Sequence, residues 1–240
     1  MRYHYVWLVW SVAFLIPWLV LFLARPDRRR AMWRTSLATS LFGLTEPLFV
    51  PRYWNPPSLL ELAQRTGFDV ESLIFCFAIG GIGLVAYDAL SGHRIIPVDP
   101  HERNHRRHRF HRLALAAPIL AFVPLFLMPW NPIYPSIASL AIGALAGMAC
   151  RPDLTRRMFL GGALFGALYA VFILGLRISA PGYIEQVWNL HDLSGVLLAG
   201  VPLEELLFGI TFGMYWSGVY EHLTWHAGAH ALLSGVARQA

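Results

Sequence analysis

The sequence contains no lysine, and all nineteen of its basic residues are arginine. This absence excludes mechanisms that require a Schiff-base lysine, including that of a retinal-binding rhodopsin, and mechanisms that require a P-loop lysine. Charged residues are also scarce, at 14% of the chain, whereas soluble domains contain about 25%. The two cysteines, Cys76 and Cys150, lie in apolar runs and form no Cys-x-x-Cys pair, which favours free, packed thiols.

Several catalytic signatures are missing as well. No Gly-rich dinucleotide fingerprint follows a predicted strand, and there is no Gly-x-Ser-x-Gly elbow and no His-Glu-x-x-His motif. The sequence therefore identifies no cofactor. The chemistry that remains is acid–base work on a substrate that itself lives in the lipid.

Apolar residues dominate the chain, which is 56% hydrophobic with a mean hydropathy of +0.49. An apolar run must contain roughly 17–25 residues to cross the hydrocarbon core of a membrane as a helix. The chain contains seven candidate runs: 5–23, 31–50, 68–90, 113–130, 133–150, 158–176 and 196–219. The sequence thus predicts an all-α integral membrane protein with seven transmembrane helices.

The arginines are distributed unevenly between the two sides of this predicted bundle. Fifteen lie in the loops 25–34, 93–112 and 151–157 or in the C-terminal tail, and four lie on the opposite side. The positive-inside rule then predicts a multi-pass protein of the cell membrane with an outer N-terminus and a cytoplasmic C-terminus. The same distribution accounts for the net charge of +5 without nucleic acid as a partner.

The two halves of the chain resemble each other. Three landmarks recur in the same order: Arg-Pro-Asp at 25–27 and 151–153, Trp-Asn at 54–55 and 188–189, and a gapless alignment of 67–90 with 200–223. This pattern predicts a parallel 3+1+3 internal repeat. Its parts are a three-helix repeat at 1–92, a basic loop and linker helix at 93–132, and a second three-helix repeat with the tail at 133–240.

The segment Gly200-Val-Pro-Leu-Glu-Glu-Leu-Leu-Phe208 places two carboxylates, Glu204 and Glu205, in an apolar run. Ionisable groups at membrane depth are functional candidates by default. Two interpretations stay open. If Pro202 is the first helical residue, both groups are ionised and lie in the first turn, where the helix dipole favours negative charge. Alternatively, burial keeps one of them protonated so that it acts as an acid.

Further acids and aromatic residues join this segment as candidates. Glu71 is the repeat counterpart of Glu204, and Glu46 is another intramembrane acid in the second span. Helical spacing places a carboxylate and a ring on one face in each half, and such rings either pack the core or stabilise a cation through their negative faces. The candidate binding residues are Glu46, Trp54, Phe75, Trp188, Phe208 and Tyr215.

The loop 93–112 is rich in histidine. Five histidines lie among six arginines, at positions 93, 101, 105, 108 and 111. No carboxylate or cysteine nearby completes a recognised metal pattern, and the arginines repel a cation. The sequence therefore favours a solvated face that anchors to anionic headgroups, and no metal site is predicted.

Val201-Pro-Leu-Glu-Glu-Leu-Leu-Phe208, followed by Tyr220-Glu221, resembles the Pro-x-Glu-Glu-x-x-Phe signature of the integral-membrane lycopene cyclase domain. That family includes bacterial two-subunit, archaeal fused and fungal bifunctional enzymes, and its domain of about three spans often occurs twice. The first half departs from the signature, because Asp69-Val-Glu-Ser replaces Pro202-Leu-Glu-Glu. The resemblance implies catalytic roles for Glu204, Glu205 and Glu71 alone.

The resemblance implies a lycopene cyclase, which is an intramolecular lyase or isomerase. Glu204 or Glu205 is expected to protonate the terminal double bond of a linear carotenoid, and an internal double bond then closes a six-membered ring. Glu71 is expected to remove a proton, so that no net redox change occurs. Aromatic side chains are expected to stabilise the cation and exclude water.

Two alternatives remain. The degenerate first half is compatible with a non-catalytic carotenoid- or lipid-binding partner subunit, and the 3+1+3 layout is also known among small transporters. Lycopene or a similar polyene and membrane lipid are the expected partners, together with a homo-oligomer or other carotenoid-pathway enzymes.

Overall fold

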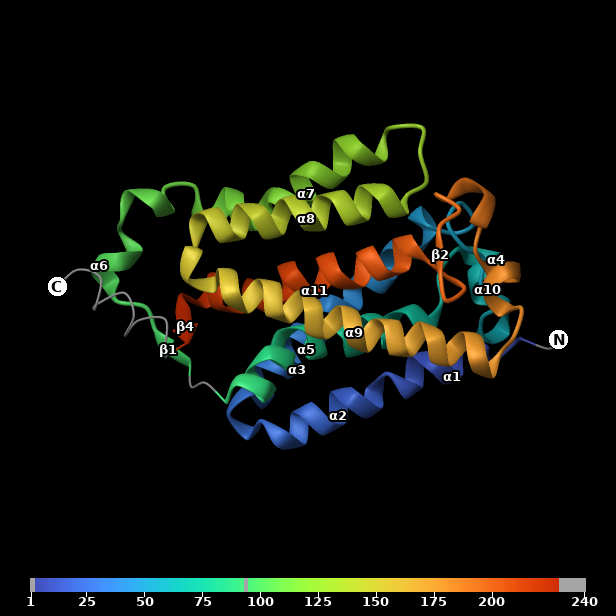
Figure 1. Ribbon diagram of the computed structural model, residues 1–240, viewed down its shortest axis with the longest axis horizontal. Helices are drawn as coiled ribbons and strands as arrows, with labels where there is room; N and C mark the ends of the chain where they lie inside the picture. The colour runs from blue at the N-terminus through green and yellow to red at the C-terminus, as the bar shows by residue number, and fades with distance from the viewer. Residues whose placement is uncertain (1–2, 93–94, 229–240) are drawn as a thin grey trace.

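A computed structural model describes residues 3–92 and 95–228 as an all-α bundle whose long helices run along the longest axis of the molecule (Figure 1). The α-helices are α1 (Val6–Ala13), α2 (Leu15–Ala24), α3 (Arg29–Ser40), α4 (Leu62–Thr66), α5 (Val70–Ser91), α6 (Pro100–Arg103), α7 (His111–Phe126), α8 (Ile133–Cys150), α9 (Thr155–Ser179), α10 (Tyr183–Val187) and α11 (Leu203–Thr224). His93 and the tail from 229 onward lie outside the described residues.

Short elements connect these helices. The 3₁₀ helices are η1 (Pro26–Arg28), η2 (Leu41–Leu48), η3 (Leu59–Glu61), η4 (Arg106–His108), η5 (Pro152–Leu154) and η6 (Leu190–Asp192). The strands form two antiparallel pairs, β1 (Ile95–Pro97) with β4 (His226–Gly228) and β2 (Leu197–Leu198) with β3 (Val201–Pro202).

Five helical segments are long and apolar enough to cross a membrane: Val6–Ala24, Val70–Ser91, His108–Phe126, Ile133–Cys150 and Pro152–Ser179. They match five of the seven predicted spans. The second predicted span is instead divided between α3 and the 3₁₀ helix η2, which contains Pro47. The seventh begins at Leu203 rather than near residue 196, because the preceding residues form the β2–β3 hairpin. The seven-helix membrane arrangement therefore stays a prediction.

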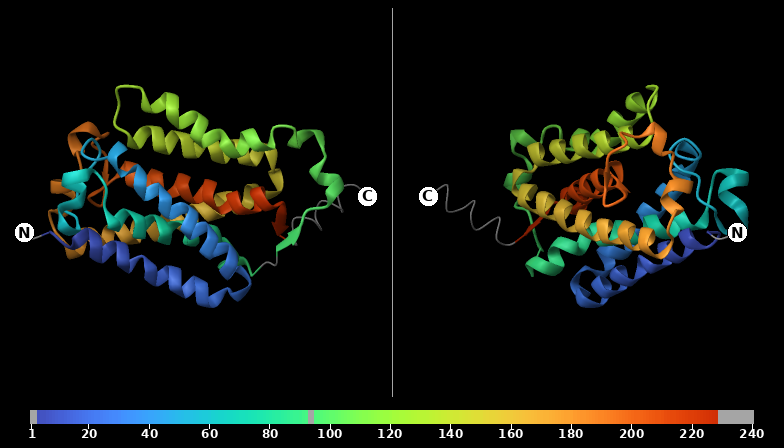
Figure 2. Two further views of the ribbon diagram at one scale, coloured as in Figure 1. Left: turned by 180° about the vertical axis from the view of Figure 1, so that it is seen from behind. Right: turned by 45° about the vertical axis from the view of Figure 1, so that its right-hand side comes forward.

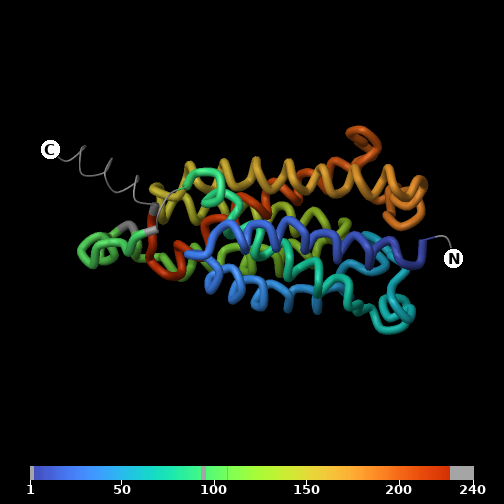
Figure 3. Tube along the Cα trace, turned by 90° about the horizontal axis from the view of Figure 1, so that it is seen from below, coloured from blue at the N-terminus to red at the C-terminus, as the bar shows by residue number. Residues whose placement is uncertain are grey.

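Helix α11 lies at the centre of the bundle. The α7–α8 pair covers one side, and α1 and α2 lie on the other, beyond α5 and α9 (Figure 2). Viewed from below, α1 and α2 run between α3 and α9 (Figure 3). The close approach of α9 and α11 requires small residues, because a Cβ on Gly213 would lie 2.8 Å from the carbonyl oxygen of Gly161. Such interfaces are typical of helices packed within membranes.

The connections gather at two ends. We call the end with α4, α10 and the β2–β3 hairpin the motif end, because the first turn of α11 lies there, and the end with α6, β1 and β4 the basic end (Figure 1). The chain therefore brings loops that are more than 100 residues apart in sequence into contact. At the motif end, the backbones of Trp54 and Trp188 form an antiparallel bridge.

Matched landmarks from the two halves make equivalent contacts. At the motif end, the Asn55 N–H donates to the Val187 carbonyl (2.8 Å), and the Asn189 N–H donates to the Tyr53 carbonyl (2.9 Å). The two bonds are equivalent, because Asn55 corresponds to Asn189 and Tyr53 to Val187 when the two halves are aligned. Each Trp-Asn landmark thus pairs with the other.

At the basic end, Arg25 and Arg151 each hold the aspartate two residues later in a two-pronged ion pair. Arg25 also donates to the carbonyl of Asp88 near the end of α5, and Arg151 donates to that of Glu221 near the end of α11. Each arginine adds a second donor to a carbonyl that already accepts from the C-cap residue of its helix, the Gly92 N–H or the Trp225 N–H. The two halves therefore end their third helix in the same way.

Candidate active site

The β2–β3 hairpin determines where the two glutamates of the motif lie. Ala199 and Gly200 both have positive φ, as a tight hairpin turn requires. The chain then passes through Pro202, which precedes α11 rather than opening it, and the Leu203 N–H donates to the Val196 carbonyl (2.9 Å). Pro202 is thus the N-cap residue and not the first helical residue, and both glutamates lie in the first turn of α11, as one of the two interpretations states. The hairpin holds the first turn of α11 beneath the loops of the motif end.

The Glu205 side chain is 4% exposed and accepts hydrogen bonds from three neutral donors. Tyr53 O–H and Trp188 Nε1–H (2.7 Å) donate to Oε1, and Tyr169 O–H (2.5 Å) donates to Oε2. Burial and the neighbouring carboxyl raise the pKa of Tyr53 well above its usual value, so this hydroxyl retains its proton and donates. Burial disfavours the ionised form of Glu205, whereas the donors that converge on both oxygens stabilise it.

The Glu204 side chain is 2% exposed and points to different partners. Its Oε1 accepts from Tyr134 O–H (2.9 Å) and from the Ser194 N–H (2.8 Å), whereas its Oε2 has no hydrogen-bond partner among the described residues. A buried polar atom without a partner costs about 1–3 kcal/mol. Glu204 also lines a cavity of about 120 Å³ whose other walls are Leu190, Leu193, Gly195, Val196, Leu197 and Pro202. One carboxyl oxygen is thus held, and the group borders an apolar space.

The geometry around this carboxyl pair can be compared with known proteins. Residues 131–223 match the family model of lycopene cyclase. This part of the chain contains both glutamates together with Tyr134, Tyr169 and Trp188, and we call it the matched segment. Carotenoid cyclisation is the activity of that family, and its substrate is a carotenoid. No curated protein and no solved structure matches the chain.

Two further acids lie at the motif end, outside the matched segment. Glu71 is fully buried, and its Oε1 accepts from the Leu59 N–H (2.7 Å), whereas its Oε2 has no partner among the described residues. Glu46 is buried beside Trp54, Ser72 and Asp69. Neither Glu71 nor Glu46 lines the cavity beside Glu204. Glu71 and Glu204 are therefore both buried at this end without sharing that cavity.

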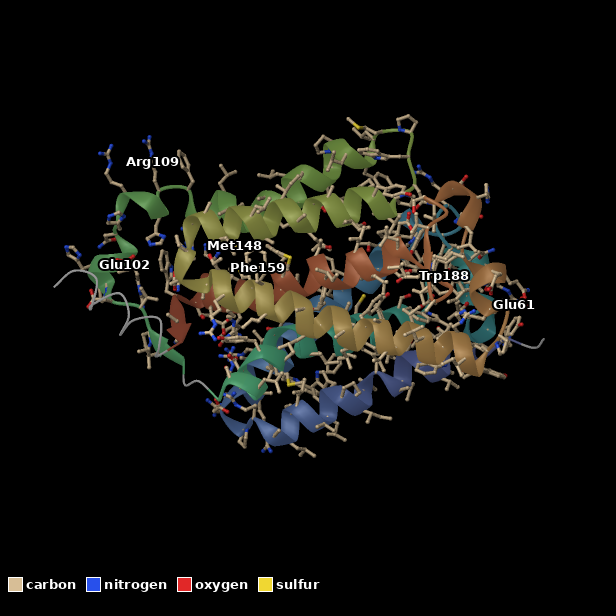
Figure 4. The ribbon with its side chains drawn as sticks, viewed as in Figure 1. Glu61, Glu102, Arg109, Met148, Phe159 and Trp188 are labelled. Carbon is tan, nitrogen blue, oxygen red and sulfur yellow. The ribbon has the colours of Figure 1, made fainter. Side chains whose placement is uncertain are left out.

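Aromatic rings surround the Glu205 carboxyl. Trp54 packs against Trp188 with ring centroids 5.3 Å apart, and Figure 4 shows Trp188 at the motif end. Phe75 and Phe208 lie 6.2 Å and 6.0 Å from the ring of Tyr169, which itself donates to Glu205. Trp54, Phe75 and Phe208 thus contact partners of Glu205, whereas Trp188 donates to the carboxyl itself.

Tyr215 lies apart from the other candidates. Its hydroxyl donates to the Leu115 carbonyl on α7 (2.9 Å), and its ring packs in a cluster with Ala144, Leu154 and Met158. Eleven residues separate Tyr215 from Glu204, or about 16 Å along a helix. The shared helical face therefore does not bring Tyr215 to the carboxyl pair.

Four partners of the two glutamates were not among the residues singled out from the sequence. Tyr53, Tyr134, Tyr169 and Ser194 come from four separate segments, and each bonds directly to Glu204 or Glu205. The position of Tyr53 beside the repeated Trp-Asn landmark was the only signal that pointed to any of them. Because they lie far apart in sequence, only the packing of the segments brings them together.

Proposed function

We propose that the protein is a membrane carotenoid cyclase that closes an end-group ring of a lycopene-type polyene by acid–base catalysis, without net redox change. The observation that carries this proposal is the environment of the Glu204 carboxyl in the matched segment. It has one oxygen held by two donors, the other without a partner among the described residues, and an apolar cavity beside it. The reaction is an isomerisation, because the substrate gains one proton and then loses one proton.

Glu204 is the proton donor in this proposal. Its proton resides on Oε2 and passes to the terminal double bond, which leaves a tertiary carbocation. An internal double bond then attacks this cation, and the new carbon–carbon bond closes the ring. Protonation of an alkene requires a strong acid, and the donors Tyr134 and Ser194 provide that strength because they stabilise the carboxylate left behind.

Glu205 contributes charge in this proposal. Three neutral donors hold it as a carboxylate, so its negative charge lies one residue from the acid. Two adjacent carboxyls resist joint ionisation, which favours a proton on Glu204 before the reaction. The same negative charge stabilises the cation that forms afterwards.

After ring closure, the cyclised cation loses a proton, and the Glu204 carboxylate accepts it in this proposal. Among the residues that line the cavity, Glu204 is the one carboxyl, whereas Glu71 lies outside this lining. Glu71 instead accepts from the Leu59 N–H and holds the 58–66 segment against α5. This assignment differs from the role that the resemblance implies for Glu71, and the variant Glu71→Gln distinguishes them.

The polyene enters from the lipid in this proposal. Val196, Leu197 and Leu198 are 45–49% exposed beside the cavity, although they are large apolar side chains. Apolar residues exposed at a cavity mouth suit a lipophilic ligand.

We also propose the parallel 3+1+3 repeat, which the matched contacts of the two halves support. We further propose that the motif end lies on the outer side of the membrane, which the clustering of arginine at the basic end supports.

Expression in cells that accumulate lycopene, followed by chromatography of the pigments, tests this function. Wild-type protein is expected to produce cyclic carotenoids, Glu204→Gln to abolish them, and Glu185→Gln, which changes an exposed glutamate on α10, to leave them unchanged. Glu71→Gln is expected to retain the same ring isomer. Unchanged lycopene beside well-expressed wild-type protein would refute the proposal and favour the partner-subunit alternative.

A further inference from the structure

A cluster of histidine and cysteine side chains lies at the basic end, far from the carboxyl pair. His108 is the last residue of η4, His111 is the first residue of α7, Cys150 is the last residue of α8, and His222 lies in the last turn of α11. His108, Cys150 and His222 are each at most 6% exposed. Three segments that are distant in sequence thus direct potential metal ligands toward one buried point.

The distances in this cluster are those of a metal centre. Cys150 Sγ lies 3.6 Å from Nδ1 of His108 and 3.6 Å from Nδ1 of His111. Ligand atoms of His108, His111 and Cys150 all lie within 4.8 Å of one another. A tetrahedral zinc ion has Zn–S bonds of about 2.3 Å and Zn–N bonds of about 2.0–2.1 Å, which places sulfur and nitrogen about 3.5 Å apart.

His222 lies beside His111 at the edge of this cluster. Its Nε2 lies 3.1 Å from Nδ1 of His111, close to the separation of about 3.3 Å expected between two nitrogens on tetrahedral zinc. Imidazole and thiolate together favour zinc over magnesium or calcium, which prefer oxygen ligands. The ligand atoms that lie within 4.8 Å of one another are thus two nitrogens and one sulfur, and His222 adjoins them through His111.

Surrounding groups support such a centre. The carboxyl of Glu102 lies 3.6 Å from Nε2 of His108, the ring nitrogen that faces away from Cys150. Carboxylates in this position orient histidine ligands and increase their basicity. The indole of Trp225 stacks on His111 with ring centroids 4.0 Å apart and covers it.

The nearest buried arginine does not prevent a cation from binding. Arg151 forms a two-pronged ion pair with Asp153, with distances of 2.8 and 2.6 Å, so its charge is balanced locally. A cysteine thiolate would also reduce the charge of a bound zinc ion from +2 to +1. The repulsion expected from the arginine-rich sequence is thus offset.

We propose that His108, His111, Cys150 and His222 form a structural zinc site that fastens the basic loop to the ends of α8 and α11. This replaces the sequence-based interpretation of the loop as a solvated face without a metal. Sequence spacing did not reveal the site, because Cys150 and His222 lie 39 and 111 residues from His111. The site is independent of the proposed cyclase chemistry, which takes place at the motif end.

The metal content of the protein purified in detergent tests this proposal. Wild-type protein is expected to retain one zinc per chain after dialysis, and Cys150→Ser and His108→Gln are expected to lose most of it. The matched controls are Cys76→Ser, which changes the cysteine outside the cluster, and His101→Gln, which changes an exposed histidine of the same loop. Both controls are expected to retain the zinc.

Cobalt provides a readout that does not depend on folding of the variants. Co²⁺ added to metal-stripped wild-type protein is expected to give the visible bands of a tetrahedral site and a thiolate charge-transfer band. Cys76→Ser is expected to retain that charge-transfer band. The proposal would be overturned by wild-type protein that binds neither zinc nor cobalt. It would also be overturned if Cys76→Ser and His101→Gln lost as much metal as Cys150→Ser and His108→Gln.

Discussion

The substitution Arg157→Gln removes half of the positive charge from a fully buried ionic network at the basic end. Arg28 and Arg157 lie among the carboxylates of Asp88 and Glu221, which are both 0% exposed. Arg28 contacts both acids, and Arg157 contacts Asp88 with both terminal nitrogens and Glu221 at 3.2 Å. Two guanidinium groups thus balance two carboxylates between α5 and α11.

The magnitude follows from this balance. Without Arg157, the network retains two carboxylates and one guanidinium, so one buried negative charge has no partner. Removal of one member of a buried ion pair costs about 3–5 kcal/mol. Arg157 also donates to the Leu84 carbonyl at 2.9 Å and to the Ser217 carbonyl, and these acceptors lose their donor. For a chain of this size, 1 kcal/mol corresponds to about 2–4 °C, so Tm is expected to fall by about 6–20 °C.

Thermal unfolding in detergent, followed by tryptophan fluorescence at a fixed scan rate, measures this effect. Arg156→Gln is the matched control, because Arg156 is the exposed neighbour on α9. Asp88→Asn added to Arg157→Gln removes the excess negative charge, so the double variant is expected to be less destabilised than the sum of the single variants. A Tm for Arg157→Gln within about 2 °C of that for Arg156→Gln would refute the reasoning.

Two further substitutions test the site and the packing. Tyr134→Phe removes a donor to Glu204 and is expected to slow cyclisation by about 10–150-fold, the equivalent of about 1.5–3 kcal/mol. Tyr215→Phe, which changes a tyrosine bonded to α7 near the middle of α11, is the control, and equal rates for the two variants would contradict the proposed acid. Gly213→Ala places a Cβ 2.8 Å from a backbone carbonyl of α9 and is expected to cost about 1–3 kcal/mol in thermal unfolding. Gly147→Ala, whose Cβ meets the flexible end of a methionine at 3.2 Å, is expected to cost less, and the opposite order would contradict the close packing of α9 and α11.

Hydropathy along the sequence predicted most helix positions well. The predicted span 133–150 coincides with α8, and the span 68–90 differs from α5 by two residues at its start and one at its end. These predictions succeed because the length and apolarity of a run are local properties. The span predicted to begin at residue 196 began too early, because hydropathy does not distinguish the apolar β2–β3 hairpin from a helix.

The candidate site was only partly predictable. The sequence indicated Glu204 and Glu205 because carboxylates are rare in an apolar run. It grouped Tyr215 with them on one helical face, but the structure places that tyrosine against α7. It gave no sign that the two glutamates have separate partners. The bonding partners of each side chain depend on the rotation of α11 relative to α8, α9 and the loops.

The sequence by itself determined the membrane class, the resemblance to lycopene cyclases, the repeated landmarks and the two acids of the motif. Only the tertiary structure decided that Glu205 is held by three donors, that Glu204 borders an apolar cavity, and that Cys150 meets His108 and His111. The physical reason is that α5 and α11 are largely apolar around their circumference, with small residues at their contacts. Their residue pattern therefore specifies that they are buried but not which neighbour each side faces.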